Sequence, residues 1–449
     1  MKITFYGGVG AVTGANYLVE SGDTKILVDC GMHQGSNFCE KHNFEPFKYD
    51  PKSISAVFVT HAHIDHIGRL PKLYRDGFRG TVYSTPPTKD FSELMLIDSE
   101  HIIIEEAKKF KKEPLYDISA VNDVVGAWKG IEYHAPVRVG PFTVTLYNAG
   151  HILGSSIIMV AAEGKTVLFS GDLGNSPAPI IGEKEYFTEA DAVVIESTYG
   201  DRLHEPSATR KEALEDAIED VVRSKGVLMI PSFAMERTQE LLFEMNSLVE
   251  QGRIPRVPIF VDSPLAIKLT TIYKKYEMYF DTATRAMIGR GDAIFNFPGL
   301  QTTLTTEESK AINEVLPPKV IIAGSGMSNG GRILHHESRY LQDPESTILF
   351  VGYQSVGTLG RQILDGAKEV KIFGEKVAVR CKVRSIPAYS AHADQAQLLA
   401  WISPMRESVK KVFIVQGEGE ASSVLAQKMR DELAVMAVVP TQDETCDII

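Results

Sequence analysis

The sequence predicts an α/β protein in which a layered α/β domain is interrupted by a second, doubly wound α/β domain. The chain has 449 residues, which exceeds the size at which one hydrophobic core keeps growing, so two domains are expected. Short apolar runs in its first part each stop at Gly, Ser, Asp or His, which is typical of strands that end at a sheet edge. From about residue 206, strand-like and helix-like segments alternate, as in parallel sheets covered by helices.

Five segments of the first part are predicted strands that end in polar residues. They are 26–28 before Asp29, 56–59 before His61, 144–147 before His151, 167–169 before Asp172 and 192–195 before Glu196. In a layered α/β fold the loops at strand ends meet at one edge of the sheet, where residues from distant sequence come together. This edge is therefore the predicted site.

The second part begins with a predicted helix, one face of which is marked by Ala213, Leu214, Ala217, Ile218, Val221 and Val222. A strand at 227–230, a helix at 238–249 and strands at 259–261, 320–323 and 348–351 follow. The strands are almost wholly apolar, which suits parallel strands buried on both faces. We interpret this block as a separate doubly wound domain.

Beyond about residue 370 the pattern returns to strand-like segments, 370–373 and 377–383, with a polar end near His392. The simplest topology inserts one domain into another. We predict a first domain in two parts, 1–205 and 370–449, and an inserted domain at 206–369. Residues 441–449 are expected to form a short tail.

The composition is that of an ordinary globular protein, with 44% hydrophobic and 23% charged residues. A net charge of −11 argues against tight nonspecific binding of nucleic acid across the whole surface. No signal peptide and no apolar stretch long enough to span a membrane is present. The four cysteines form no Cys-x-x-Cys pair, which favours a reducing cytoplasm; they are Cys30, Cys39, Cys381 and Cys446.

A dense histidine cluster follows the predicted strand at 56–59. Alternate residues of an extended chain point to the same face, so His61 and His63 can bind one ion. A turn into a helix would place Asp65 and His66 one turn onward, where they can bind a second. A lone histidine is usually a surface loop residue, but three histidines and an aspartate this close together favour metal. Imidazoles and carboxylates suit zinc or manganese, and His151 and Asp172 would complete and bridge the pair.

These motifs resemble the metallo-β-lactamase superfamily, whose signature is His-x-His-x-Asp-His followed by a lone histidine and a lone aspartate. The resemblance covers nearly the whole chain and extends to the β-CASP branch, the nucleases that include the cleavage and polyadenylation endonuclease and bacterial ribonuclease J. Glu196 in Glu-Ser-Thr-Tyr-Gly and His392 in Ser-Ala-His-Ala-Asp are similar to motifs of that branch. The resemblance implies a metallo-β-lactamase αββα sandwich with an inserted doubly wound β-CASP domain.

The resemblance also implies a role for each site residue. The first ion would be held by His61, His63 and His151, and the second by Asp65 and His66. Asp172 would bridge the two Zn²⁺ ions, and Mn²⁺ is an alternative. The pair would supply hydroxide at neutral pH. Asp29 would fix a ligand imidazole, His392 would give a proton to the leaving 3′ oxygen, and Glu196 would orient His392.

One position departs from the family pattern. The family has a histidine ligand of the second metal in a Val-His-Gly-Glu segment, whereas this chain has Gln416 in Val-Gln-Gly-Glu. Three interpretations stay open: a working site with a weaker second ion, a preference for a harder ion such as manganese, or reduced activity. We favour the first.

A phosphate cradle is a further prediction for the inserted domain. A glycine-rich turn exposes backbone N–H groups and a guanidinium grips phosphate through two hydrogen bonds. The candidate residues are Ser232, Arg237, Ser325, Gly326 and Arg332. Taken alone, such glycine-rich strand ends more often reflect turn geometry.

The predicted function is a cytoplasmic, metal-dependent ribonuclease that cleaves single-stranded RNA in RNA processing or decay. It would act as an endonuclease, with 5′ exonuclease action left open, and a homodimer is implied by resemblance. The alternatives are a DNA nuclease of the same branch, a small-molecule metallo-hydrolase and an RNA-binding scaffold. An inserted domain argues against a small ligand. Six of seven expected ligand positions are retained, which argues against a scaffold.

Overall fold

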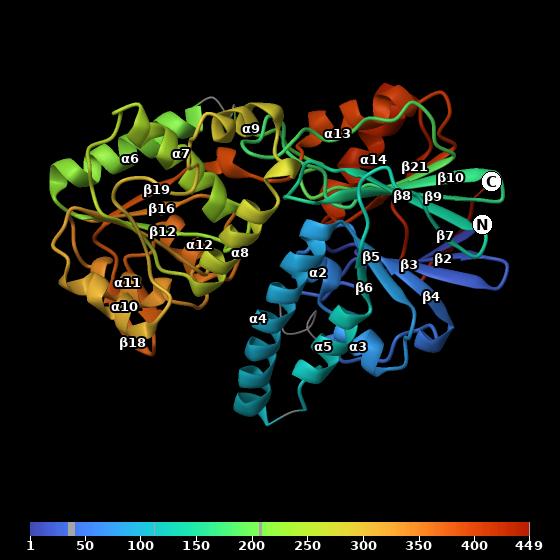
Figure 1. Cartoon of the computed structure of the whole chain (residues 1–449), viewed down its shortest axis with the longest axis horizontal. Coiled ribbons are helices and arrows are strands. Elements are labelled where there is room, and N and C mark those ends of the chain that lie inside the picture. Colours follow the sequence, from blue (N-terminus) through green and yellow to red (C-terminus); the bar gives the residue numbers. More distant parts are fainter. Residues whose placement is uncertain (35–40, 112, 206–208, 449) are drawn as a thin grey trace. The chain divides into compact units, whose positions relative to one another are not determined.

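A computed structural model describes residues 1–34, 41–111, 113–205 and 209–448. Cys39 lies outside these residues, and the other three cysteines are buried free thiols. The chain divides into two compact units (Figure 1). Unit 1 comprises Met1–Leu203 and Ala391–Ile449, and unit 2 comprises His204–Ser390. Unit 2 is thus an insertion in the sequence of unit 1.

Unit 1 contains two seven-stranded sheets. In spatial order the first consists of β22 (Thr445–Asp447), β1 (Lys2–Gly7), β2 (Asn16–Ser21), β3 (Thr24–Val28), β4 (Ile54–Phe58), β5 (Thr81–Ser84) and β6 (Trp128–Gly130). The second consists of β21 (Ala437–Val438), β20 (Lys411–Val415), β11 (Ala192–Glu196), β10 (Lys165–Phe169), β9 (Ser156–Ala162), β8 (Phe142–Asn148) and β7 (Val137–Val139). Their inner faces share one apolar core, in which the rings of Phe5 and Phe413 lie 5.0 Å apart.

Helices cover the outer faces of both sheets, as Figure 1 shows for α3 to α5 on one side and α13 and α14 on the other. The first layer contains η1 (Pro51–Ser53), α2 (Ile64–Ile67), α3 (Leu70–Arg75), α4 (Pro86–Phe110) and α5 (Ile118–Gly126). The second contains α13 (Gln395–Ile402), η6 (Ser403–Met405) and α14 (Gly419–Leu433). Each layer buries its own apolar core against its sheet. The predicted αββα sandwich is confirmed.

The predicted site edge is present in unit 1. The five predicted strand segments overlap β3, β4, β8, β10 and β11, with starts within two residues and ends within one residue of the observed bounds. Within one sheet β3 and β4 run parallel, and in the other β10, β11 and β20 do. Their polar carboxyl ends therefore face the same edge in each sheet.

Unit 2 contains a six-stranded sheet whose neighbouring strands are all parallel. The order is β14 (Leu300–Thr302), β13 (Ile259–Val261), β15 (Lys319–Ala323), β12 (Val227–Pro231), β16 (Thr347–Phe350) and β19 (Lys382–Ser385). Figure 1 shows α6 (Arg210–Ser224) and α7 (Arg237–Glu250) on one side and α10 (Thr306–Ala311) and α11 (Ile333–Tyr340) on the other. The predicted doubly wound architecture is confirmed.

Unit 2 contains further helices. They are α8 (Pro264–Lys275), η3 (Glu277–Tyr279), α9 (Thr282–Gly289), η4 (Ile312–Glu314), α12 (Leu359–Leu364) and η5 (Pro387–Tyr389). A hairpin of β17 (Glu369–Ile372) and β18 (Glu375–Ala378) packs on the same core as α11 and α12.

The end of unit 2 differs from the predicted boundary at residue 369. The expected single strand at 377–383 is wrong, because β18 ends at Ala378 and β19 begins at Lys382 in a different sheet. β19 pairs in parallel with β16, and Val370 and Val377 are buried in the core of unit 2. Residues 370–390 therefore belong to unit 2, and unit 1 resumes at Ala391.

The C-terminal segment also differs from its prediction as a tail. β22 pairs in antiparallel register with β1, and Cys446 and Ile448 are buried in the core between the sheets. Among the described residues, no helix combines enough length with enough apolar character to span a lipid bilayer.

Candidate metal centre

The histidine segment leaves β4 and enters α2, which begins directly after His63. Asp29, at the end of β3, accepts hydrogen bonds from the backbone N–H and the hydroxyl of Thr60, each at 2.8 Å. These bonds tie the start of the segment to the neighbouring strand. The predicted arrangement along strand end and helix is confirmed for His61, His63, Asp65 and His66.

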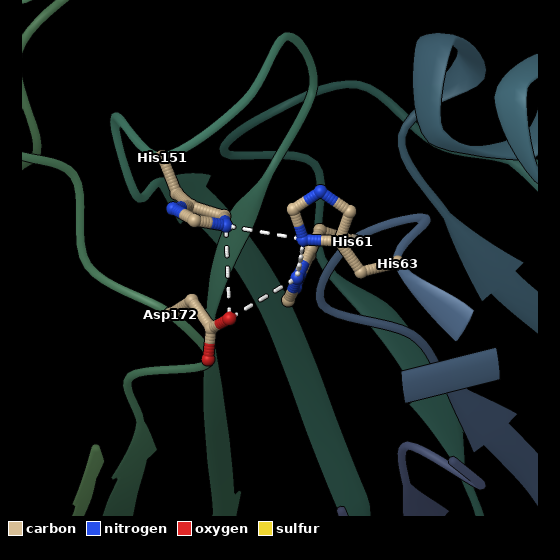
Figure 2. Close-up of side chains that lie close together, drawn as sticks. All are labelled: His61, His63, His151 and Asp172. Carbon is tan, nitrogen blue, oxygen red and sulfur yellow. Dashed lines mark hydrogen bonds and ion pairs between the residues drawn. The ribbon is translucent and has the colours of Figure 1, made fainter. Parts of the chain in front are cut away.

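Four side chains converge at this edge of unit 1, as Figure 2 shows. His63 Nδ1 lies 3.0 Å from His61 Nε2 and 3.3 Å from His151 Nε2. Asp172 Oδ2 lies 3.4 Å from the first of these Nε2 atoms and 3.6 Å from the second. A tetrahedral ion with bonds of about 2.0 to 2.1 Å holds its ligand atoms about 3.3 to 3.4 Å apart. The four side chains therefore fit a divalent cation with three nitrogen ligands and one oxygen ligand.

The electrostatics of this cluster suit a cation. Burial lowers the pKa of His63 and of His151 well below the usual range, so both rings stay neutral and keep a lone pair. His151 Nδ1 lies 3.3 Å from the carbonyl oxygen of Ala391, which accepts its N–H and leaves Nε2 for a metal. Burial alone would raise the pKa of Asp172, but neighbouring imidazoles, led by His66, hold it well below its usual range.

Asp65 and His66 lie beside Asp172 but form a looser group. His66 Nε2 is 3.4 Å from Asp172 Oδ1 and 3.8 Å from Asp65 Oδ2. Its Nδ1 lies 2.8 Å from Asp29 Oδ2, the contact that the sequence predicted for Asp29. Among the described residues two groups of side chains have the spacing of a metal site, and neither includes Asp65 or His66.

The second of those groups contains Asp172, Glu196 and His392. Glu196 ends β11, is fully buried, and accepts a hydrogen bond from the backbone N–H of Leu173 at 2.6 Å. His392 Nδ1 lies 3.1 Å from Glu196 Oε2 and 3.9 Å from Asp172 Oδ2. Burial alone would lower the pKa of His392, but these carboxylates, led by Glu196, raise it to about 9. The predicted contact between Glu196 and His392 is confirmed.

All five predicted phosphate-binding residues lie in unit 2, where most make internal contacts. Ser232 follows β12, and its hydroxyl lies 3.0 Å from that of Thr238. Ser325 follows β15, and its hydroxyl accepts the backbone N–H groups of Asn329 and Gly330 at 3.0 and 3.2 Å.

The remaining three are held in the same way. The backbone carbonyl of Gly326 accepts the side-chain amide of Gln354 at 3.0 Å. Arg332 donates to Asp262 Oδ1 at 2.7 Å and to the carbonyls of Thr303 and Leu304. Arg237 is buried and contacts Glu236 and Glu240. Phosphate binding by all five stays a prediction.

Replacing Arg237 with methionine is expected to lower the free energy of unfolding of unit 2 by about 3 kcal/mol. The substitution leaves the buried carboxylate of Glu240 without its partner, and it removes a guanidinium that lies 5.3 Å from the Tyr389 ring. Urea unfolding followed by far-UV circular dichroism measures the change, with exposed Arg223→Met as the matched control. A change below about 1 kcal/mol together with weaker RNA binding would favour the phosphate role instead.

Sequence reasoning missed a buried polar group in unit 2. His336, to which the sequence assigned no role, is 2% exposed, and its Nε2 lies 2.7 Å from Asp262 Oδ2. Asp262 follows β13 directly and is itself a polar residue at a strand end. The rule that polar residues at strand ends mark a site, which located Asp29 and Asp172, would also have located Asp262. No local pattern marks its partner His336.

Comparison with known families divides the chain into three matched segments. Residues 9–232 match the metallo-beta-lactamase superfamily, residues 238–363 match the Beta-Casp domain, and residues 376–440 match the Zn-dependent metallo-hydrolase RNA specificity domain. A crystal structure of a protein of unknown function from Enterococcus faecalis V583 shares the fold, with a TM-score of 0.59, 14% identity and 99% of each chain covered.

Relatives match along nearly all of the chain. Ribonuclease TTHA0252 from Thermus thermophilus is 38% identical, with 94% of each chain covered. An RNase J-like protein from Methanocaldococcus jannaschii is 31% identical, with 98% of each chain covered. Transcription termination factor FttA from Methanosarcina mazei is 30% identical over the whole of this chain and 72% of its own. The chain belongs to the β-CASP branch of the metallo-β-lactamase superfamily.

Proposed function

We propose that this protein is a zinc-dependent ribonuclease that hydrolyses phosphodiester bonds of single-stranded RNA. The observation that carries the proposal is that Asp172 belongs to two clusters at once. One of its oxygens faces the histidine ligands, and His392 with its Glu196 partner lies beside the same carboxylate. A cation and an acid–base group can therefore act on one phosphate.

RNA as the substrate is supported by the relatives rather than by the ligands. Two of the similar proteins are named as a ribonuclease and as an RNase J-like protein, and the segment at 376–440 matches an RNA specificity domain. Hydrolysis by water needs no 2′-hydroxyl, so the same ligand set would serve DNA equally well. The test therefore includes a DNA of the same sequence beside the RNA.

When bound, a divalent cation supplies hydroxide from water at neutral pH and offsets negative charge on the phosphoryl oxygens. His61, His63, His151 and Asp172 would hold it and place the scissile phosphate beside His392. Water oxygen then bonds to phosphorus, and the bond from phosphorus to the 3′ oxygen breaks. His392 donates a proton to that leaving oxygen, and Glu196 holds the His392 ring through its contact with Nδ1.

Zinc is proposed because three imidazoles and one carboxylate at tetrahedral spacing are its usual ligands. Manganese is the alternative, since it accepts the same nitrogen and oxygen donors. Endonucleolytic cleavage, the homodimer and the cytoplasmic location all follow from resemblance and composition, and they are part of the proposal.

The test uses the purified full chain with a 5′-labelled single-stranded RNA and its DNA counterpart, with and without Zn²⁺ or Mn²⁺. His63→Ala removes one ligand, and His101→Ala replaces an exposed histidine of the same unit as the matched control. Products are resolved on a sequencing gel. We expect metal-dependent cuts in RNA that persist in His101→Ala and vanish in His63→Ala.

Two outcomes would contradict the proposal in different ways. Cuts in DNA with RNA left intact would keep the metal centre and replace the substrate. No cuts in either polymer by protein shown by elemental analysis to carry metal would remove the nuclease assignment.

A further inference from the structure

Gln416 occupies the position at which the family has a histidine ligand. It directly follows β20 and is 2% exposed. Its backbone N–H donates to the carbonyl of Gly8 at 2.6 Å, and its own carbonyl accepts the hydroxyl of Thr198 at 3.2 Å. Hydrogen bonds of its N–H and of its carbonyl therefore fix the backbone of Gln416, and this fixes the position from which its side chain extends into the metal centre.

The side-chain amide of Gln416 contacts two of the atoms that would hold a second cation. Its Nε2 lies 2.9 Å from Asp172 Oδ1 and 2.9 Å from His66 Nε2. Its Oε1 accepts the hydroxyl of Tyr17 at 3.4 Å. The amide nitrogen therefore faces Asp172 and His66, and the carbonyl oxygen faces Tyr17.

The partners determine which way round the amide lies. A carboxylate oxygen accepts and does not donate, so Asp172 Oδ1 requires the nitrogen of the amide. On the other side of the amide, the hydroxyl of Tyr17 donates to Oε1 at 3.4 Å. Turning the Gln416 amide over would place its oxygen 2.9 Å from a carboxylate oxygen, which can only accept. The donor side therefore faces Asp172.

This arrangement has different consequences for the two cation positions. The two atoms that face Gln416, His66 Nε2 and Asp172 Oδ1, are 3.4 Å apart, and the amide nitrogen lies 2.9 Å from each of them. The histidine cluster uses the other oxygen of Asp172, Oδ2, which Gln416 does not contact. The amide competes with a second cation and leaves the first site open.

We propose that the amide of Gln416 takes the place of the second cation, so that this chain binds a single divalent ion tightly, at His61, His63, His151 and Asp172. Gln416 then holds Asp172 and His66 by hydrogen bonds, a task that a second ion would otherwise perform. The inference rests on the proposed metal centre, and it is independent of the nature of the substrate. It replaces the two-zinc expectation with one ion per chain.

The test measures metal stoichiometry without any nucleic acid. Full-length protein is stripped with a chelator, titrated with Zn²⁺ by calorimetry, desalted and analysed by inductively coupled plasma mass spectrometry. We expect one ion per chain for the wild type and two for Gln416→His, with the second site at least about 100-fold tighter in the variant. With Mn²⁺, electron paramagnetic resonance should show an isolated ion in the wild type and an exchange-coupled pair in Gln416→His.

Two control variants test whether a second ion binds because of a histidine at position 416, because of an added histidine elsewhere or because the amide is removed. Gln427→His adds a histidine at an exposed position of α14 and should still bind one ion. Gln416→Leu removes both donor and acceptor without supplying a ligand, and it should also bind one. Far-UV circular dichroism checks the fold of each variant.

Zero ions or two tight ions in the wild type would overturn the proposal, whatever the variants do. A Gln416→His protein that folds and still binds one ion would refute Gln416 as the cause. Cleavage of RNA is assayed on the same preparations. A wild type that binds one ion and cuts nothing would contradict the proposed function and support this inference. A wild type that cleaves RNA with two ions bound would support the proposed function and contradict this inference.

Discussion

Replacing Asp172 with asparagine is expected to remove the bound metal and to lower RNA cleavage roughly 10³- to 10⁴-fold. Asp172 is the one carboxylate of the four-ligand cluster, and its pKa is held well below its usual range, so it carries a full negative charge beside a cation. An amide of the same shape keeps the packing and loses the charge. Loss of the cation forfeits several kcal/mol of stabilisation, and about 1.4 kcal/mol corresponds to a tenfold change in rate.

The measurement pairs metal content by mass spectrometry with single-turnover cleavage of the labelled RNA. Asp123→Asn, an exposed aspartate on α5, is the matched control and should change neither. If Asp172→Asn retained a full complement of metal, the assignment of Asp172 as a ligand would be wrong, even if cleavage were lost.

Replacing His392 with alanine is expected to lower the rate of cleavage by about 10²- to 10⁴-fold while leaving metal content unchanged. His392 contacts Glu196 through Nδ1 and lies outside the four-ligand cluster, so its loss removes a proton donor and not a ligand. His392→Ala should keep the metal that Asp172→Asn loses, and this difference in metal content separates the role of His392 from that of Asp172.

An RNA with sulfur in place of the bridging 3′ oxygen sharpens the test, because a thiolate leaves without a proton. The His392→Ala defect should shrink at least tenfold on that substrate, since proton donation then contributes little. Glu196→Gln should show a smaller defect of the same kind, because Glu196 acts through the His392 ring. His101→Ala is the control. If His392→Ala slowed cleavage of the sulfur-containing RNA as much as cleavage of ordinary RNA, the role of His392 would be structural.

Much of the centre was predictable because the rule for strand ends is local. An apolar run that stops at a polar residue marks the carboxyl end of a strand, and this pattern located Asp29, His61, His151, Asp172 and Glu196 without any knowledge of the packing. Parallel neighbours then bring these ends to one edge of each sheet. The contact between Glu196 and His392, 196 residues apart in sequence, came from resemblance and not from spacing.

The errors arose where pairing partners are distant. Residues 377–383 look like one strand, but β18 turns back on β17 whereas β19 joins β16. Residues 445–447 look like part of a tail, yet they pair with β1 from the other end of the chain. No sequence pattern marks His336 as buried, yet it is 2% exposed and its Nε2 lies 2.7 Å from Asp262 Oδ2. Strand pairing and the burial of charge are both decided by neighbours that local periodicity does not reveal.

The sequence by itself predicted the layered architecture and most residues of the metal centre, because periodicity and polar strand ends are properties of short segments, and the resemblance of its motifs gave the family. Only the tertiary structure decided what Gln416 does. The presence of a glutamine at this position is compatible with a weaker second ion, with a different metal and with reduced activity. Its amide is oriented by Tyr17 and Asp172, which lie 399 and 244 residues away along the chain. Hydrogen-bond direction depends on which acceptors surround a group, and folding alone brings those acceptors together.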